Sequence, residues 1–119
     1  GALTLLRLQD GSAAEHVRAR LPAHVRVAAT FKTVPAALLN DLDRSLDCDE
    51  FVCGDSQEAR TRAMDVVKAI GGLRAVDVGP LTRARSLEHL TLLAIAINRR
   101  NKIHEARFRV VGLEKTRPA

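Results

Sequence analysis

The stretch DEFVCGDSQEARTRAMDVVKAIGGLRAVDVGP, Asp49 to Pro80, decides the fold of this chain. It begins with a short apolar run, FVC, that predicts a strand ending at Gly54. Asp55 then stands where a helix cap is expected, and Glu58 follows three residues later. The next residues predict a helix, because their apolar members recur at the spacing of one helical face: Ala59, Ala63, Val66, Val67 and Ile70.

The second half of this stretch ends the helix and starts another strand. Gly71 and Gly72 tolerate the left-handed backbone that closes a helix. Residues 75–78 then begin an apolar strand that Gly79 and Pro80 terminate. A strand, a helix and a strand within about 30 residues predict a parallel, right-handed crossover unit. Because such strands are covered on both faces, we expect helices as their neighbours.

The segment before this unit predicts a helix, a strand, a second short helix and a loop. Ser12 and Glu15 form a capping box, and the helix after it is expected to turn Ala13, Val17 and Leu21 inward. Residues 25–31, VRVAATF, predict a strand, and residues 35–39 a short helix that Pro35 starts. Residues 40–50 predict a solvated acidic loop, since the four aspartates lack the spacing of a calcium loop.

The segment after the unit predicts one long helix, Arg83 to about Lys102, and a final short strand over residues 108–111. The helix carries a wide apolar stripe of Leu87, Leu90, Leu93, Ala94 and Ile97. So wide a stripe favours burial in the core or against a second copy of the chain. We therefore expect a homodimer that forms through this helix.

Composition limits the classes of protein to which the chain can belong. Its 119 residues, 46% of them hydrophobic, fit a single α/β domain, residues 1–119. Three Phe and no Trp or Tyr argue against single-stranded nucleic-acid binding, which uses aromatic stacking, and we expect no nucleic-acid partner. No apolar run reaches the roughly 20 residues of a membrane span, so we expect no membrane partner and a cytoplasmic location. Residues 66–119 carry 11 basic and 4 acidic side chains, which suits either an anionic ligand or a solvated basic surface.

Patterns typical of catalytic or metal sites do not occur in the sequence. Cys48 and Cys53 have the spacing of neither a redox pair nor a zinc site, and the four histidines are scattered. The seven glycines form neither a GxGxxG fingerprint nor a Walker loop. Gly54 precedes a helix start that could hold an anion, but Asp55 and Glu58 would repel it. No catalytic side chain and no metal ligand is therefore predicted.

Several blocks of the sequence, in order, resemble a known family. These blocks are FKTVPAA at residues 31–37, DCD at 47–49, VCGD at 52–55, GLRAVDVGPL at 72–81 and NRR at 98–100. They resemble the NADPH-dependent coenzyme F-420 reductases, and the resemblance runs from about Ser12 to Leu113. It covers only the C-terminal half of such an enzyme. The glycine-rich NADP loop of the family's N-terminal Rossmann half does not occur in this sequence.

This resemblance implies a fold, an activity and a site. The fold would be the second half of a Rossmann-type reductase, an α/β domain with three short parallel strands, crossover helices and a long C-terminal helix. The activity would be hydride transfer between NADP(H) and coenzyme F-420, a deazaflavin. The residues implied to contact the deazaflavin, largely through their backbone, are Lys32, Thr33, Val34, Pro35 and Ala37, with Leu113 near the end of the chain. Lys32 departs from the histidine that the family commonly has there.

Two functions from different classes stay open at this point. The chain is either the deazaflavin-side half of the oxidoreductase or a non-catalytic dimerisation or binding module of the same architecture. In the first case NADP would be held only by an N-terminal Rossmann half or partner chain, and this chain alone would be inactive. An upstream GxGxxG half in the coding sequence would favour the enzyme.

Overall fold

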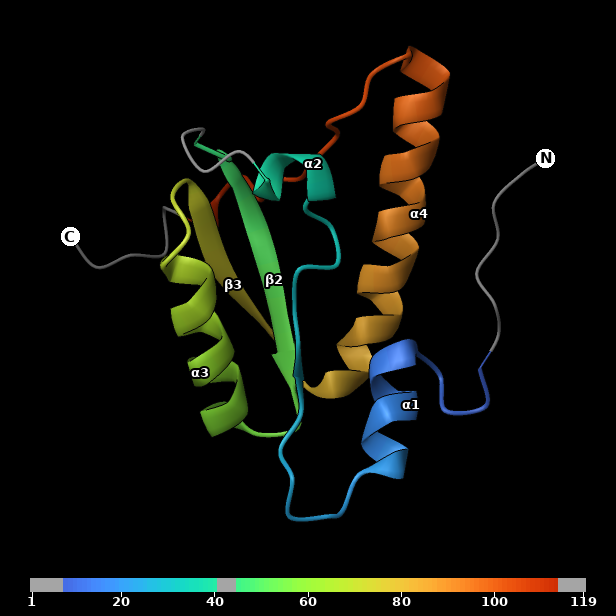
Figure 1. Ribbon diagram of the computed structural model, residues 1–119, viewed down its shortest axis with the longest axis vertical. Coiled ribbons are helices and arrows are strands. Elements are labelled where there is room, and N and C mark those ends of the chain that lie inside the picture. Colours follow the sequence, from blue (N-terminus) through green and yellow to red (C-terminus); the bar gives the residue numbers. More distant parts are fainter. Residues whose placement is uncertain (1–7, 41–44, 114–119) are drawn as a thin grey trace.

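The computed structural model describes residues 8–40 and 45–113. The strands form one sheet in the order β1-β2-β3, with β2 at its centre (Figure 1). The predicted strand–helix–strand unit and the long C-terminal helix are confirmed, and the fold is α/β. In chain order, the elements are α1 (Ala13–Arg20), β1 (Ala28–Ala29), α2 (Ala36–Leu39), β2 (Cys48–Gly54), α3 (Gln57–Lys68), β3 (Leu73–Gly79), the 3-10 helix η1 (Leu81–Arg83) and α4 (Ala84–Asn101).

One strand differs in direction from the prediction. β2 and β3 are parallel, with Cys48 opposite Leu73, and α3 crosses between them. β1 is antiparallel to β2 and pairs over two residues only, so the sheet is mixed. A parallel pair needs a connection that returns the chain to the other end of the sheet. The connection from β1 to β2, which contains the short helix α2, instead reverses the chain at one end of the sheet. β2 therefore runs back antiparallel to β1.

The sheet lies between two layers of helices, α3 on one face and α1 with α4 on the other (Figure 1). Every residue of β2 is buried, as expected for a central strand with both faces covered. Phe51 and Cys53 pack against α1, η1 and α4, whereas Cys48 and Val52 pack against α2 and α3. The alternation of side chains along β2 therefore builds two cores from one strand.

The residue that caps the N-terminus of α3 differs from the predicted one. The hydroxyl of Ser56, not the carboxylate of Asp55, accepts the hydrogen bond from the N–H of Ala59. Asp55 instead joins β1 to the end of β2: its carboxylate accepts from the N–H of Val27 at 3.1 Å, and its own N–H donates to the Val27 carbonyl at 3.0 Å. Both residues are good caps, and the neighbouring strand decides which one caps. The predicted Ser12 cap of α1 is confirmed.

Several predicted helix faces and ends also need correction. In α1 the buried residue is Ala14, whereas Ala13, Val17 and Leu21 are exposed. α3 ends at Lys68, before the glycines, and residues 108–111 form no strand. Among the described residues, no helix combines the length and the apolar character needed to cross a membrane.

Gly72 adopts the left-handed backbone conformation that was predicted for it, and a close contact gives a second reason for glycine at this position. Its φ is +84°, and a Cβ at this position would lie 2.4 Å from the backbone nitrogen of Leu46. The backbone of residues 45–47 therefore passes against the start of β3, where only glycine fits.

The apolar stripe of α4 is only partly buried. Leu87 and Ala94 are buried and Leu90 packs beside the core, but Leu93 is 51% exposed. The helix continues past the sheet at its C-terminal end (Figure 1). The expected pairing of two copies through α4 stays a prediction.

Candidate functional site

The predicted cofactor segment, residues 32–37, leads from β1 into α2. Phe31, just before it, has a φ of 58°, a left-handed backbone conformation that is uncommon for a bulky residue. Pro35, with a φ of −60°, immediately precedes the short helix, and its carbonyl accepts from the N–H of Leu38 at 3.0 Å. The turn is therefore fixed at both ends, by a strained residue and by a proline ring.

Lys32 is anchored to α4 by its backbone and its side chain. Its carbonyl accepts a hydrogen bond from the hydroxyl of Thr91. Its Nζ lies 3.8 Å from Oε2 of Glu88, a carboxylate that also accepts from the N–H of Ala13. The Lys32 charge is thus shared with Glu88, which weakens its suitability as a partner for an anionic ligand.

The other predicted contact residues differ in what they can offer a ligand. Thr33 is 5% exposed, and its hydroxyl is buried with no hydrogen-bond partner in the described part of the chain. Val34 packs into the core beside Leu38 and Val52, so only its backbone could reach a ligand. Ala37 lies within α2, and Leu113 is half-buried at the end of the described chain. This arrangement suits contacts made by the backbone, and the Thr33 hydroxyl could take part only if the atoms that cover it moved.

The segment that ends at Leu113 is held to the sheet by a buried carboxylate. Both oxygens of Asp49, on β2, accept 2.7 Å hydrogen bonds from the guanidinium of Arg74, on β3. The N–H of Val110 donates to the same carboxylate at 2.6 Å, and the Val110 carbonyl accepts from Arg74 at 2.6 Å. A further bond runs from the N–H of Asp49 to the carbonyl of Phe108, at 2.8 Å. We call these residues the Asp49–Arg74 clasp.

The clasp stabilises the negative charge of the buried Asp49 carboxylate. Burial raises the pKa of Asp49, but the hydrogen bonds from Arg74 and from the Val110 N–H outweigh it and hold this pKa below its usual value. Asp49 is therefore a carboxylate at neutral pH, fully paired although it is buried. Predicting residues 40–50 as a solvated loop was wrong for Asp49 and Glu50, which belong to β2. Asp41 and Asp43 lie outside the described residues.

Glu50 is the buried group that sequence reasoning missed. It is 0% exposed, and neither carboxylate oxygen has a hydrogen-bond partner among the described residues. Burial raises its pKa to about 7, although the N–H groups of Phe31 and Lys32 and the hydroxyl of Thr30 act in the opposite direction. These groups lie near the carboxyl without reaching hydrogen-bonding geometry. Glu50 thus lies against the candidate turn and changes charge close to neutral pH.

The two cysteines offer no reactive thiol. Both are buried and neither forms a disulfide, and burial raises the pKa of each, to about 11 for Cys48. A thiol with such a pKa stays protonated and unreactive at neutral pH. Within residues 8–40 and 45–113, no group of three or more metal-binding side chains comes together.

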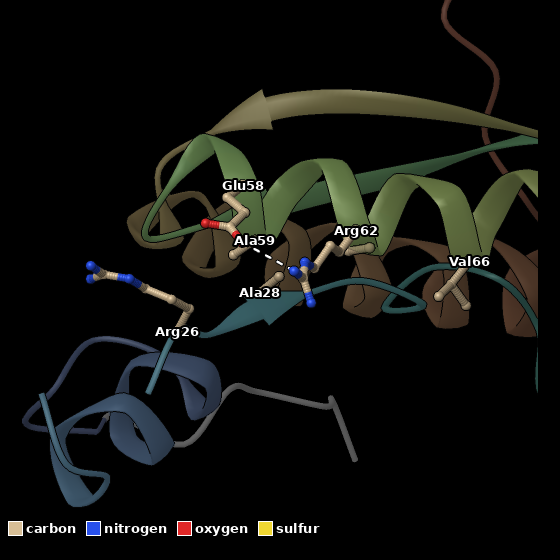
Figure 2. Close-up of a pocket in the computed structure, with 7 residues that line it drawn as sticks. Arg26, Ala28, Glu58, Ala59, Arg62 and Val66 are labelled. Carbon is tan, nitrogen blue, oxygen red and sulfur yellow. Dashed lines mark ion pairs between the residues drawn. The ribbon is translucent and has the colours of Figure 1, made fainter. Parts of the chain in front are cut away.

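A groove lies along the β1 edge of the sheet, which is the edge opposite β3 (Figure 2). It has a volume of about 420 Å³ and runs between β1 and α3. Ala28, Ala59, Ala63 and Val66 supply its apolar wall, and charged side chains stand around it: Arg26, Glu58 and Arg62. The sequence placed Val66 on the inward face of α3, yet the side chain is 56% exposed here.

Comparison with known proteins relates the chain to one family. No family model matches the sequence. Over 110 residues, 92% of this chain, it is 39% identical to the F420-dependent NADP reductase of Methanocaldococcus jannaschii. Over 113 residues it is 37% identical to the protein of the same name from Methanothermobacter marburgensis. Over nearly its whole length the chain is similar to the family of F420-dependent NADP reductases. It spans about half the length of these curated reductases, 49% and 50% respectively.

The reductase fold is also found among solved structures. A protein of Arthrobacter sp. FB24, provisionally named an F420-dependent NADP-reductase, superposes with a TM-score of 0.78 at 25% sequence identity. The match covers 91% of this chain and 50% of that protein. Both kinds of comparison thus relate nearly the whole chain to about half of a reductase.

Proposed function

We propose that this chain is the deazaflavin-side, C-terminal half of an oxidoreductase that transfers a hydride between NADP(H) and coenzyme F-420. The observation that carries the proposal is the match of 92–94% of the chain to half of the F420-dependent NADP reductases. The other half would supply the nucleotide-binding module and could be a preceding domain or a separate chain.

The turn at residues 32–35 suits the deazaflavin in two respects. Its backbone is fixed before any ligand arrives, which lowers the entropy that binding must offset. The Thr33 hydroxyl is buried and has no partner in the described chain, so a polar group of a ligand that displaced the atoms covering it would satisfy it. Coenzyme F-420, when bound, supplies the hydride chemistry itself. The chain's own part is to position the ring, and none of its side chains has to move a proton.

The Asp49–Arg74 clasp has a supporting role in this proposal. It fixes residues 108–110 against the sheet and thereby limits where Leu113, three residues further on, can lie. Leu113 would then approach the cofactor as the resemblance implies. Lys32, already paired with Glu88, would contribute its backbone rather than its charge.

The proposal is tested by hydride transfer in a chimera. The part of the Methanocaldococcus jannaschii reductase that this chain does not match would be joined to the chain. The chimera is expected to oxidise NADPH with saturable loss of the oxidised deazaflavin absorbance, and the chain alone is expected to show none. Holding a nicotinamide takes a glycine-rich turn at a helix start, which this sequence lacks.

Two outcomes of this assay would change the proposal. Rapid, saturable turnover by the chain alone would overturn the division of the site between two halves. A folded chimera without turnover would favour the alternative, a non-catalytic dimerisation or binding module. The exposed Leu93 on α4 is the observation that supports such a module.

The candidate turn makes a separate prediction about binding. Pro35→Gly is expected to weaken coenzyme F-420 binding by the chimera about 3- to 10-fold. Glycine leaves the backbone of the turn more mobile before binding, and ordering it on binding would cost about 1 kcal/mol more than with proline. Lys32→His is expected to change the affinity less than about twofold, since Glu88 already shares the Lys32 charge. Fluorescence titration would measure both.

Pro22→Gly is the matched control, because it makes the same change at an exposed site just after α1. If Lys32→His abolished binding while Pro35→Gly had no effect, the assignment of the turn would be wrong.

A further inference from the structure

Glu50 carries a carboxyl group that the fold buries without pairing it. The residue is 0% exposed, and neither carboxyl oxygen has a hydrogen-bond partner among the described residues. Because side chains alternate along a strand, Glu50 lies on the face of β2 that carries Cys48 and Val52. Its protonated form is neutral, whereas its ionised form has a charge that water would solvate and this site does not. Ionisation of Glu50 therefore favours any conformation of the chain that lets water reach it.

The candidate turn is the weakest part of the cover over Glu50. The N–H groups of Phe31 and Lys32 and the hydroxyl of Thr30 lie near the carboxyl. Residues 30–35 connect β1 to α2, and β1 pairs with β2 over two residues only, so no strand ladder holds them. The other neighbours are more regular, since β2 pairs along its length with β3 and α3 is a 12-residue helix. Segments with few backbone hydrogen bonds open first, so water would reach Glu50 through residues 30–35.

The charged side chains of the elements around Glu50 have other partners or are exposed. The pairs described for them are Lys32 with Glu88, Arg74 with Asp49 and Arg60 with Asp77. The exposed charged residues of α3 are Glu58, Arg62, Asp65 and Lys68. α2 has no titratable residue, and the thiol of Cys48 stays protonated at neutral pH because burial raises its pKa to about 11. In the described part of the chain, no paired cation therefore compensates the charge of Glu50.

We propose that Glu50 is a positioning residue for the deazaflavin turn: its ionisation opens residues 30–35, and the chain binds coenzyme F-420 in the closed form, with Glu50 protonated. The identity of the ligand rests on the proposed function, whereas the opening of the turn does not. Glu50 would act through the backbone of the turn and need not touch the coenzyme.

The direction of the pH dependence follows from the two forms of the turn. In the closed form burial raises the pKa of Glu50 from its usual 4.5 to about 7, and water restores the usual value in the open form. The closed form therefore binds the proton more tightly, and opening becomes more favourable as the pH rises from 4.5 to about 7. With these two pKa values, the equilibrium constant for opening rises about 10-fold between pH 6 and pH 8.

Trypsin cleavage after Lys32 measures this opening in the isolated chain. The bond lies inside the candidate turn, and cleavage of a folded protein follows the population of the opened form. From pH 6 to pH 8 the cleavage rate of the unmodified chain, divided by that of Glu50→Gln, is expected to rise about 10-fold. The division removes the pH dependence of trypsin itself. Cleavage after Arg100, in the exposed last turn of α4, is the internal control and is expected to keep a constant ratio.

Two further variants separate the charge of Glu50 from other effects of the substitution. Glu50→Leu also removes the charge and is expected to behave as Glu50→Gln does. Glu58→Gln is the matched control, because it removes a carboxylate at an exposed position of α3. It is expected to show the same rise in cleavage after Lys32 as the unmodified chain.

Titration of the chimera with coenzyme F-420 measures the consequence for binding. The apparent affinity falls with the fraction of molecules in which the turn is closed. The dissociation constant of the unmodified chimera, divided by that of the Glu50→Gln chimera, is expected to rise at least about threefold between pH 6 and pH 8. This division removes any titration of the coenzyme.

Three results would overturn the proposal. One is a cleavage ratio after Lys32 that is the same at pH 6 and pH 8. Another is an equal rise after Arg100, which would mean that Glu50 acts on the whole chain and not on the turn. The third is a constant ratio of dissociation constants in a chimera that binds the coenzyme. A folded chimera that binds no coenzyme would contradict the proposed function, and cleavage after Lys32 would still decide whether Glu50 controls the turn.

Discussion

Arg74→Ala is expected to lower the free energy of unfolding by about 3 to 5 kcal/mol, because it leaves the buried carboxylate of Asp49 without its charged partner. The side chain of Asp49 is 0% exposed, and Arg74 supplies two of the three hydrogen bonds described for its carboxylate. A loss of this size is a large share of the 5 to 15 kcal/mol that typically stabilises a domain, so we expect partial unfolding at 37 °C. Urea unfolding, monitored by circular dichroism, would measure the change.

The segment at residues 108–110 provides a second measure of the same variant. Arg74 also donates to the carbonyl of Val110, so its loss is expected to free this segment and speed tryptic cleavage after Arg107 and Arg109. Removing both charges, in the double variant Asp49→Leu with Arg74→Met, is expected to recover part of the stability, since no unpaired charge then stays buried.

Arg109→Ala is the matched control for Arg74→Ala. Arg109 bonds Asp47 at 2.8 Å, but both side chains are mostly exposed. Exposed pairs contribute at most about 1 kcal/mol, so only a small loss is expected. Equal losses from Arg74→Ala and Arg109→Ala would show that the clasp has no special role.

Glu50→Gln is expected to stabilise the chain by about 2 to 3 kcal/mol at pH 8 and to leave its stability nearly unchanged at pH 4. Burial raises the pKa of Glu50 from its usual 4.5 to about 7, so the folded chain binds this proton more tightly than the unfolded chain does. The stability that this group contributes is therefore fully present below pH 4.5 and is lost as the pH rises to about 7. Glutamine stays neutral throughout and avoids the loss.

Unfolding curves from pH 4 to pH 8 would measure this effect, and the carboxyl carbon shift of Glu50 would report its pKa directly. Glu58→Gln is the control, because Glu58 is exposed on α3 and pairs only with Arg62 among the described residues. It is expected to change stability by less than about 1 kcal/mol at every pH. A constant difference between Glu50→Gln and the unmodified chain from pH 4 to pH 8 would contradict the expected ionisation.

The block FKTVPAA led to the candidate site, which stays a prediction, but it did not indicate which distant residues support this turn. Proline at position 35 indicates a fixed turn in any context. The pairing of Lys32 with Glu88 and the burial of Val34 depend on residues that are distant in the sequence. Asp49 and Glu50 could have been identified as strand residues from the apolar residues that follow them. The cluster of aspartates before them favoured a loop instead.

The sequence by itself determined the local elements and the unit that they form. The spacing of the apolar residues was enough to predict β2, α3 and β3. A helix places every third or fourth residue on one face and a strand every second residue, so each spacing of apolar residues suits only one kind of element. Only the tertiary structure decided the direction of β1, the cap of α3 and the states of two adjacent carboxyl groups. Asp49 points toward Arg74 and the Val110 N–H and stays charged, whereas Glu50 points to the other face and finds no charged partner among the described residues. The physical reason is that a strand sends neighbouring side chains to opposite faces, and what meets them there comes from distant parts of the chain.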